Sequence, residues 1–141
     1  MFNEATAIFP STYMHYKNSA SPPPLGREYN SHYVQAITRE AERVNANRGP
    51  TRKPLKVLPW VWFRYISDHR TLLEAADMQT ALAGPGVAGA DGVLFYEDGL
   101  SWGPSTSQKT QRATVQAYIE KVVGPIATQL YGNQSYLKPL V

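Results

Sequence analysis

Short apolar runs alternate along this chain with longer stretches of helical periodicity. Three apolar runs have the length of a β-strand: ATAIFPSTY at residues 5–13, KVLPWVWFRY at 56–65 and GVLFY at 92–96. Each run is followed by a stretch in which apolar residues recur every three or four positions, as on one face of a helix. The order strand, helix, strand, helix, strand, helix predicts a parallel sheet with helices packed against it.

Capping and stop signals predict the limits of the first two helices. Asn30 or Ser31, after a loop rich in Pro, Ser and Gly, is positioned to cap the first helix. Thr71 and Glu74 form a capping box at the start of the second helix. The Gly-Pro-Gly stretch at residues 84–86 predicts its end.

The last helix has the clearest amphipathic pattern of the chain. Its apolar residues repeat at helical spacing: Val115, Tyr118, Ile119, Val122, Val123, Ile126 and Leu130. Within it, Gly124 and Pro125 predict a kink or a split, because proline disrupts a helix interior. The stretch 131–141 is predicted to be an irregular tail.

The three strand–helix units suggest either part of a larger α/β domain or a small open layer protein. The strands are continuous apolar runs, which is typical of strands covered on both faces. A closed (β/α)8 barrel needs roughly 250 residues, and this chain has 141. Three parallel strands alone would leave two open sheet edges.

Composition narrows the function classes further. No apolar run reaches the roughly 18 to 20 residues that span a bilayer, and the N-terminal residues lack the pattern of a signal peptide. There are no cysteines, and the three histidines, His15, His32 and His69, are scattered. We therefore predict no disulfide, no metal site and no cofactor.

The net charge is +3, and the basic residues gather in the middle of the chain. The cluster consists of Arg39, Arg43, Arg48, Arg52, Lys53, Lys56, Arg64 and Arg70. Such a cluster can concentrate an anionic partner near the protein. A solvated helix face followed by a basic loop is the alternative interpretation, and no nucleic-acid-binding motif accompanies the cluster.

The carboxyl ends of the three strands carry the candidate chemistry, since reacting groups of α/β barrels lie at those ends. The residues there are Ser11, Thr12 and Tyr13, then Phe63, Arg64 and Tyr65, then Tyr96, Glu97 and Asp98, with Trp102 beyond. Aromatic rings beside hydrogen-bonding groups suit a sugar. The alternative is that these rings fill the core.

The adjacent carboxylates Glu97 and Asp98 are poorly placed for a glycosidase acid pair. Neighbouring residues on a strand point to opposite faces of the sheet. We expect Glu97 and Asp98 to lie in a solvated loop or to cap a helix.

Four segments together resemble a known family. TAIFPSTY, KVLPWVWFRY, GADGVLFYEDG and VQAYIEKVVGPIA, in this order, resemble the C-terminal half of the hyaluronidases, glycoside hydrolase family 56. The second segment is similar to the venom-type hyaluronidases of insects. The resemblance extends over roughly residues 1–130 and implies three βα units that form the C-terminal part of a distorted TIM-like barrel.

The resemblance also implies an activity, a substrate and a location. Family members cleave β-1,4 bonds of hyaluronan or chondroitin by a substrate-assisted retaining mechanism. Their general acid lies in an Asp-x-Glu motif. This chain has no Asp-x-Glu, so the acid and the N-terminal half of the barrel are expected upstream of residue 1. The full-length protein is then expected to be secreted or lysosomal.

Five positions are implied as substrate-binding residues: Tyr13, Phe63, Arg64, Tyr65 and Tyr96. Tyr13 matches a tyrosine that hydrogen-bonds the acetamido group or the catalytic Glu. Phe63 matches a family tyrosine and lacks its hydroxyl, although Tyr65 faces the same side. Tyr96 matches a tryptophan and keeps a smaller aromatic wall.

Two other functions remain open at this point. The changes at Phe63 and Tyr96 are compatible with a catalytically inactive, glycan-binding relative. The basic cluster is compatible with a small basic α/β module that binds polyanions without sugar chemistry.

Overall fold

The computed structural model describes residues 5–17, 27–49, 52–97 and 107–132. Its strands are β1 (Ala7–Ile8), β2 (Lys56–Val57), β3 (Trp60–Trp62) and β4 (Leu94–Tyr96). Its helices are α1 (Arg27–Ala46), α2 (Ala75–Val87), α3 (Gln108–Tyr118) and α4 (Gly124–Tyr131), and a π-helical segment, Ile119–Val123, joins α3 to α4.

The strands pair in parallel, as the sequence predicts. β1 pairs with β2 and β3 pairs with β4, in two two-stranded sheets. A single parallel bridge between Ser11 and Trp60 connects the two sheets. The stretch 56–62 therefore lies between the segment of β1 and that of β4. The described residues form a mixed α/β layer and do not close into a barrel.

Pro59 lies between β2 and β3, where its missing N–H costs no ladder bond. The N–H groups of Leu58 and Trp60 donate toward β1, to Ile8 O at 2.9 Å and Pro10 O at 2.8 Å. Pro59 faces the other side, where its carbonyl accepts from Leu94 N at 2.8 Å. Because β4 begins only at Leu94, the proline lies where no donor is needed.

The predicted cap of the first helix is wrong. α1 begins at Arg27, before both Asn30 and Ser31. The side chain of Asn30 is fully buried, and its Nδ2 donates to Tyr16 O at 2.8 Å. Asn30 thus ties α1 to the segment after β1.

The capping box predicted for the second helix is also wrong. The hydroxyl of Thr71 donates to the carboxylate of Asp68, and Glu74 precedes α2 without a side-chain capping bond. The helix continues through the Gly-Pro-Gly stretch to Val87. Gly89, whose φ of 103° only glycine adopts readily, follows shortly after its end.

The last helix splits near Gly124 and Pro125, as predicted. The N–H of Gly124 donates to Ile119 O, five residues back, which is the bonding of a π-helix. A proline ring clashes with the carbonyl four residues before it in a regular α-helix, and the wider π turn precedes Pro125. Ile119, which belongs to the apolar pattern of this helix, is 41% exposed.

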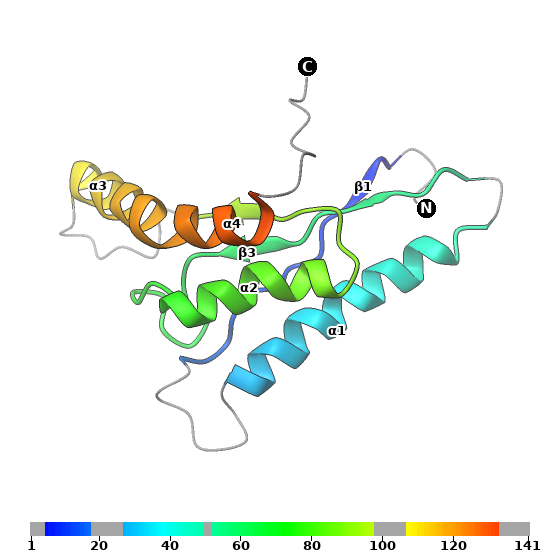
Figure 1. Ribbon diagram of the computed structural model, residues 1–141, viewed down its shortest axis with the longest axis horizontal. Coiled ribbons are helices and arrows are strands. Elements are labelled where there is room, and N and C mark those ends of the chain that lie inside the picture. Colours follow the sequence, from blue (N-terminus) through cyan, green and yellow to red (C-terminus); the bar gives the residue numbers. More distant parts are fainter. Residues whose placement is uncertain (1–4, 18–26, 50–51, 98–106, 133–141) are drawn as a thin grey trace.

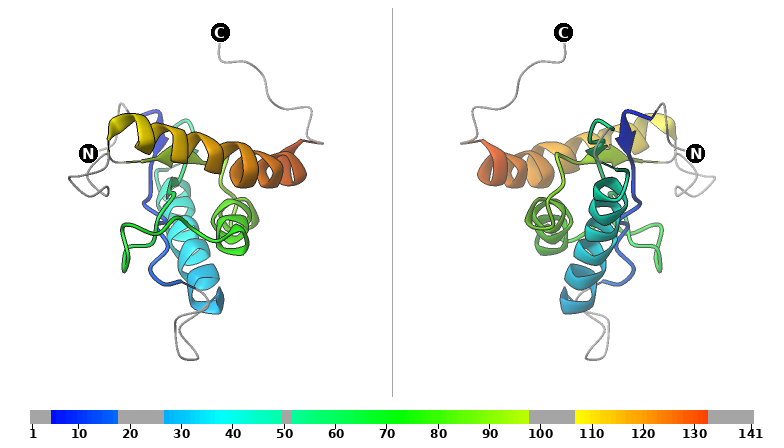
Figure 2. Two further views of the ribbon diagram at one scale, coloured as in Figure 1. Left: turned by 90° about the vertical axis from the view of Figure 1, so that its left-hand side faces the viewer. Right: turned by 90° about the vertical axis from the view of Figure 1, so that its right-hand side faces the viewer.

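The hydrophobic core lies between the strands and the helices. Val61, Phe63 and Tyr65 pack against apolar residues of all three helical units: Val34, Met78, Ala81, Leu82, Tyr118 and Val123. Figure 1 shows α2 between α1 and α4, and the α3–α4 rod crosses above both α1 and α2 in the two views of Figure 2. The opposite face of the strands carries Trp60 and Trp62.

α1 and α2 approach each other closely at Gly84. A Cβ atom at Gly84 would lie 2.8 Å from Cγ1 of Val34. Val34 is fully buried and β-branched, so it has little freedom to move. We expect Gly84→Ala to lower the free energy of unfolding by about 1–3 kcal/mol in denaturant titration.

Gly86→Ala is the matched control, since both glycines lie in α2. A Cβ at Gly86 would meet only the hydroxyl of Tyr131, at 3.6 Å. Alanine has the higher helix propensity, so Gly86→Ala should be neutral or stabilising by up to about 1 kcal/mol. Equal destabilisation by both variants would contradict the steric explanation.

Candidate functional site

An aromatic face covers the strands on the side opposite the helices. We define it by Phe9, Tyr13, Trp60, Trp62 and Tyr96. The rings of Tyr13 and Tyr96 are stacked, with centroids 6.3 Å apart and an interplanar angle of 14°. Tyr13 and Tyr96, which the sequence places at the carboxyl ends of two different strands, therefore lie together at one rim of the sheet.

Strand register brings these rings together. Trp62 and Tyr96 are directly paired across β3 and β4, and parallel neighbours project to the same face. Thr12 fixes the segment that carries Tyr13, because its N–H and hydroxyl both bond Trp60 O at 3.0 Å. The ring of Trp62 lies 5.8 Å from that of Tyr13 and 5.1 Å from that of His69.

Exposure varies strongly within the aromatic face. Trp62 is 5% exposed, whereas Tyr96 is 40% exposed and Tyr13 is half-buried. The tyrosine pair therefore offers ring surface and hydroxyl groups to a ligand, and the buried ring of Trp62 lies against Tyr13. A surface of this kind can stack on the apolar face of a sugar and hydrogen-bond its edge.

Arg64 lies at the end of the same central strand and is only 1% exposed. Its Nε donates to Oε1 of Glu97 at 2.8 Å. Its Nη1 donates to His69 O at 3.3 Å and to Arg70 O at 3.0 Å. The prediction of a solvated or helix-capping Glu97 is wrong, because the buried guanidinium holds its carboxylate. Asp98 and Trp102 lie outside the described residues.

The structure does not bring Phe63 and Tyr65 to the aromatic face. The ring of Phe63 packs against Phe95 and Tyr118 in the helix-side core, at centroid distances of 5.2 and 5.8 Å. Tyr65 is fully buried in the same core. The strand alternation that puts Trp60 and Trp62 on one face puts Phe63 and Tyr65 on the other.

The hydroxyl of Tyr65 belongs to a buried polar network at the start of α2. It donates to Oδ2 of the fully buried Asp77 at 2.5 Å and accepts from Glu74 N at 3.0 Å. Burial, together with the hydrogen bond to Asp77, raises the pKa of Tyr65 well above its usual range. This hydroxyl is committed to the fold.

A second aromatic cluster, which the sequence reasoning missed, joins the segment after β1 to the start of α1. It consists of His15, Tyr16, Tyr29 and Tyr33. Burial raises the pKa of Tyr33, and the neighbouring Tyr29 adds to the effect. The four-residue spacing of Tyr29 and Tyr33, which places both on one helix face, was the available signal.

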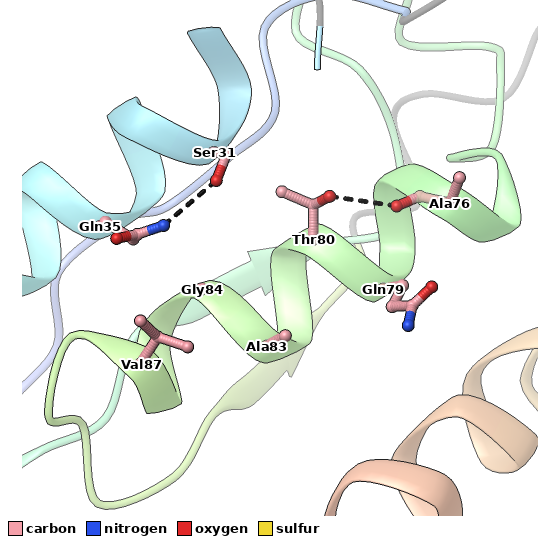
Figure 3. Close-up of a pocket in the computed structure, with 8 residues that line it drawn as sticks. All are labelled: Ser31, Gln35, Ala76, Gln79, Thr80, Ala83, Gly84 and Val87. Atoms are coloured by element: carbon pink, nitrogen blue, oxygen red, sulfur yellow. Dashed lines mark hydrogen bonds between the residues drawn. The ribbon is translucent and has the colours of Figure 1, made fainter. Parts of the chain in front are cut away.

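Two hollows in the described part of the chain lie away from the aromatic face. One of them, of about 290 Å³, lies between α1 and α2. Figure 3 shows the uncharged residues that line it. Two of its polar side chains already donate hydrogen bonds within the protein: Gln35 to Ser31 Oγ, and Thr80 to Ala76 O. A larger apolar groove of about 740 Å³ runs between α2, the β4 segment and α4.

Three members of the basic cluster are paired with three different carboxylates. Arg43 pairs with Glu40, Lys56 with Asp91, and Arg64 with Glu97. Within the ranges that the structure describes, no three ligating side chains gather into a metal site. Nor does any helix of that part have the length and apolar character that crossing a bilayer requires.

A sequence profile of the hyaluronidases, glycoside hydrolase family 56, matches residues 1–134. The chain belongs to the hyaluronidase family. The resemblance of the four sequence segments is thereby confirmed.

Named hyaluronidases of stinging insects are among its relatives. The chain is 25% identical over 130 residues to a hyaluronidase of Dolichovespula maculata. That match covers 92% of this chain and 35% of the wasp protein. It is 27% identical over 137 residues to a hyaluronidase of Apis mellifera, and this match covers 96% of this chain and 32% of the bee protein. The chain thus spans about a third of the length of the curated relatives it matches.

Solved hyaluronidase structures share the fold. A monoclinic crystal structure of bee venom hyaluronidase superposes with a TM-score of 0.73 at 23% identity, over 89% of this chain and 36% of that one. The structure of the same enzyme in complex with a hyaluronic acid tetramer superposes with a TM-score of 0.75 at 22% identity, over 92% of this chain and 36% of that one. The parallel α/β arrangement described above is therefore the fold of the matching part of a hyaluronidase.

Proposed function

We propose that this chain forms the substrate-binding wall of a hyaluronidase-type glycoside hydrolase. The observation that carries the proposal is the stacked pair Tyr13 and Tyr96 on the aromatic face, at the carboxyl ends of parallel strands. Membership of the hyaluronidase family supports the reaction class. The complex of bee venom hyaluronidase with a hyaluronic acid tetramer supports hyaluronan as the substrate class.

The reaction proposed is hydrolysis of a β-1,4 N-acetylhexosaminide bond with retention. The acetamido oxygen of the substrate attacks the anomeric carbon, and a Glu outside this chain protonates the leaving oxygen. A water deprotonated by the same Glu then attacks the anomeric carbon, breaks the bond to the acetamido oxygen and releases the sugar with its configuration retained. The hydroxyl of Tyr13 would hold the acetamido group, and the ring of Tyr96 would pack against its methyl. Both contacts orient the internal nucleophile for attack.

The other three implied substrate-binding residues take supporting roles in this proposal. Phe63 and Tyr65 stabilise the strand beneath the substrate-binding wall, since both pack into the core between strands and helices. Arg64 is 1% exposed and bonded to Glu97, so it acts on the substrate through its neighbours. We further propose that the strands form part of a barrel closed by a portion of the protein outside this sequence.

An assay of the protein made from its complete coding sequence tests the proposal. An Asp-x-Glu motif should be encoded upstream, and the protein should release reducing ends from hyaluronan. Tyr13→Phe should lower kcat/KM by about 10²-fold, because a hydrogen bond to the reacting group is lost in the transition state. Complete reading frames that lack an Asp-x-Glu motif would refute hydrolysis by the acid proposed here.

Two other results would favour the alternative functions. Saturable binding of hyaluronan oligosaccharides without turnover would indicate a glycan-binding relative. Salt-sensitive binding to hyaluronan, heparin and nucleic acid alike would indicate a basic polyanion-binding module.

A further inference from the structure

The two ends of the central stretch 56–64 are each fastened to the β4 segment by an ion pair. At the carboxyl end, Arg64 Nε lies 2.8 Å from Glu97 Oε1. At the amino end, Lys56 Nζ lies 2.5 Å from Asp91 Oδ1, and Val57 N donates to the same carboxylate at 2.9 Å. The two pairs join the same segments at opposite ends.

Burial distinguishes the two pairs. The side chains of Arg64 and Glu97 are 1% and 17% exposed, whereas those of Lys56 and Asp91 are 69% and 32% exposed. A buried guanidinium–carboxylate bond is directional and is weakly screened. An exposed lysine pair restrains geometry much less.

The buried pair also reaches a third segment. Arg64 Nη1 donates to the carbonyls of His69 and Arg70, in the turn that follows the central strand. The guanidinium therefore joins that turn to the end of β4. Glu97 is the residue directly after Tyr96, so the pair restrains the backbone that carries the tyrosine ring.

We infer that Arg64 and Glu97 are positioning residues that hold the ring of Tyr96 parallel to that of Tyr13. β3 pairing fixes Tyr96 from one side, through its partner Trp62. The ion pair fixes it from the following residue. Without the pair, the restraint that Arg64 places on Glu97, the residue that follows the end of β4 at Tyr96, is lost. This inference deepens the proposed function, on which its consequence for sugar binding rests.

The experiment measures ring geometry and sugar affinity separately, in the complete protein. Ring geometry is read from the NMR cross-peak between labelled Tyr13 and Tyr96, and affinity from titration with a hyaluronan tetrasaccharide. Glu97→Gln and Arg64→Lys should weaken the cross-peak and raise Kd about tenfold. Lys56→Gln, which breaks the exposed pair, should leave both unchanged.

Control measurements separate positioning from general loss of stability. Tm is recorded for every variant. If the single variants fail to fold, the double variant Arg64→Met/Glu97→Leu removes both charges at once, a change that buried pairs often tolerate. It should fold and show the same loss of the cross-peak and of affinity.

Two outcomes would overturn the inference. One is a Tyr13–Tyr96 cross-peak in Glu97→Gln, or in the double variant, as strong as in the wild type. The other is an equal loss of the cross-peak in Lys56→Gln. If the wild type shows the cross-peak but binds no tetrasaccharide, the proposed function fails, while loss of the cross-peak in Glu97→Gln alone still supports the positioning role.

Discussion

Replacing Tyr65 with phenylalanine is expected to lower the free energy of unfolding by about 2–3 kcal/mol. The substitution removes the donor to Oδ2 of the fully buried Asp77 and the acceptor of Glu74 N at the start of α2. A hydrogen bond to a buried charged group stabilises a fold more than a neutral bond does. Chemical denaturation followed by far-UV circular dichroism measures the loss.

Tyr29→Phe provides the comparison for Tyr65→Phe. The ring of Tyr29 packs in the half-buried cluster beside α1, against Tyr33 and Tyr16. Its loss of a hydroxyl should change the free energy of unfolding by less than about 0.5 kcal/mol. A Tyr65→Phe protein as stable as the wild type would show that Asp77 does not depend on this phenol.

Replacing Tyr96 with alanine is expected to weaken binding of hyaluronan oligosaccharides by at least about tenfold, or about 1.4 kcal/mol. The ring of Tyr96 is stacked on Tyr13 and is 40% exposed, so it offers a surface to the sugar. Tyr96→Trp should retain or strengthen the affinity, because indole gives the larger wall. Isothermal titration with a hyaluronan tetrasaccharide gives both values.

Phe95→Ala is the matched control for Tyr96→Ala. The two residues are neighbours on β4 and each is 40% exposed. They face opposite sides, because Phe95 packs against Phe63 in the helix-side core. Phe95→Ala should therefore lower Tm and leave the affinity unchanged. If Phe95→Ala weakens binding as much as Tyr96→Ala does, the aromatic face is not the sugar site.

Much of the fold could be predicted because its periodicities are strong. The apolar runs and the helical stretches between them indicated parallel strands and helices in the observed order, except that the single strand predicted at 56–65 is divided into β2 and β3. The helix ends were harder, because capping residues have competing uses in the folded chain. Asn30 bonds the carbonyl of Tyr16, and Thr71 bonds Asp68. Both contacts depend on segments that the local pattern does not include.

The site could be predicted only in part, for a related reason. A strand buried on both faces carries apolar residues at every position, so its sequence does not indicate which residues face the helices. Tyr13 and Tyr96 could be placed on one rim from the strand ends alone. The division between Phe63 and Tyr65 on one side and the tryptophans on the other required the register of the central strand.

That register depends on Pro59 in a way that concerns folding fidelity. The residues on either side of it, Leu58 and Trp60, donate to the carbonyls of Ile8 and Pro10. If the central strand slipped by one residue, the proline would take one of these donor positions, and that carbonyl would have no N–H to accept. The same slip would turn Trp60 and Trp62 toward the helices. Pro59 thus disfavours the misregistered strand pairing, in which the tryptophans of the aromatic face would point toward the helices.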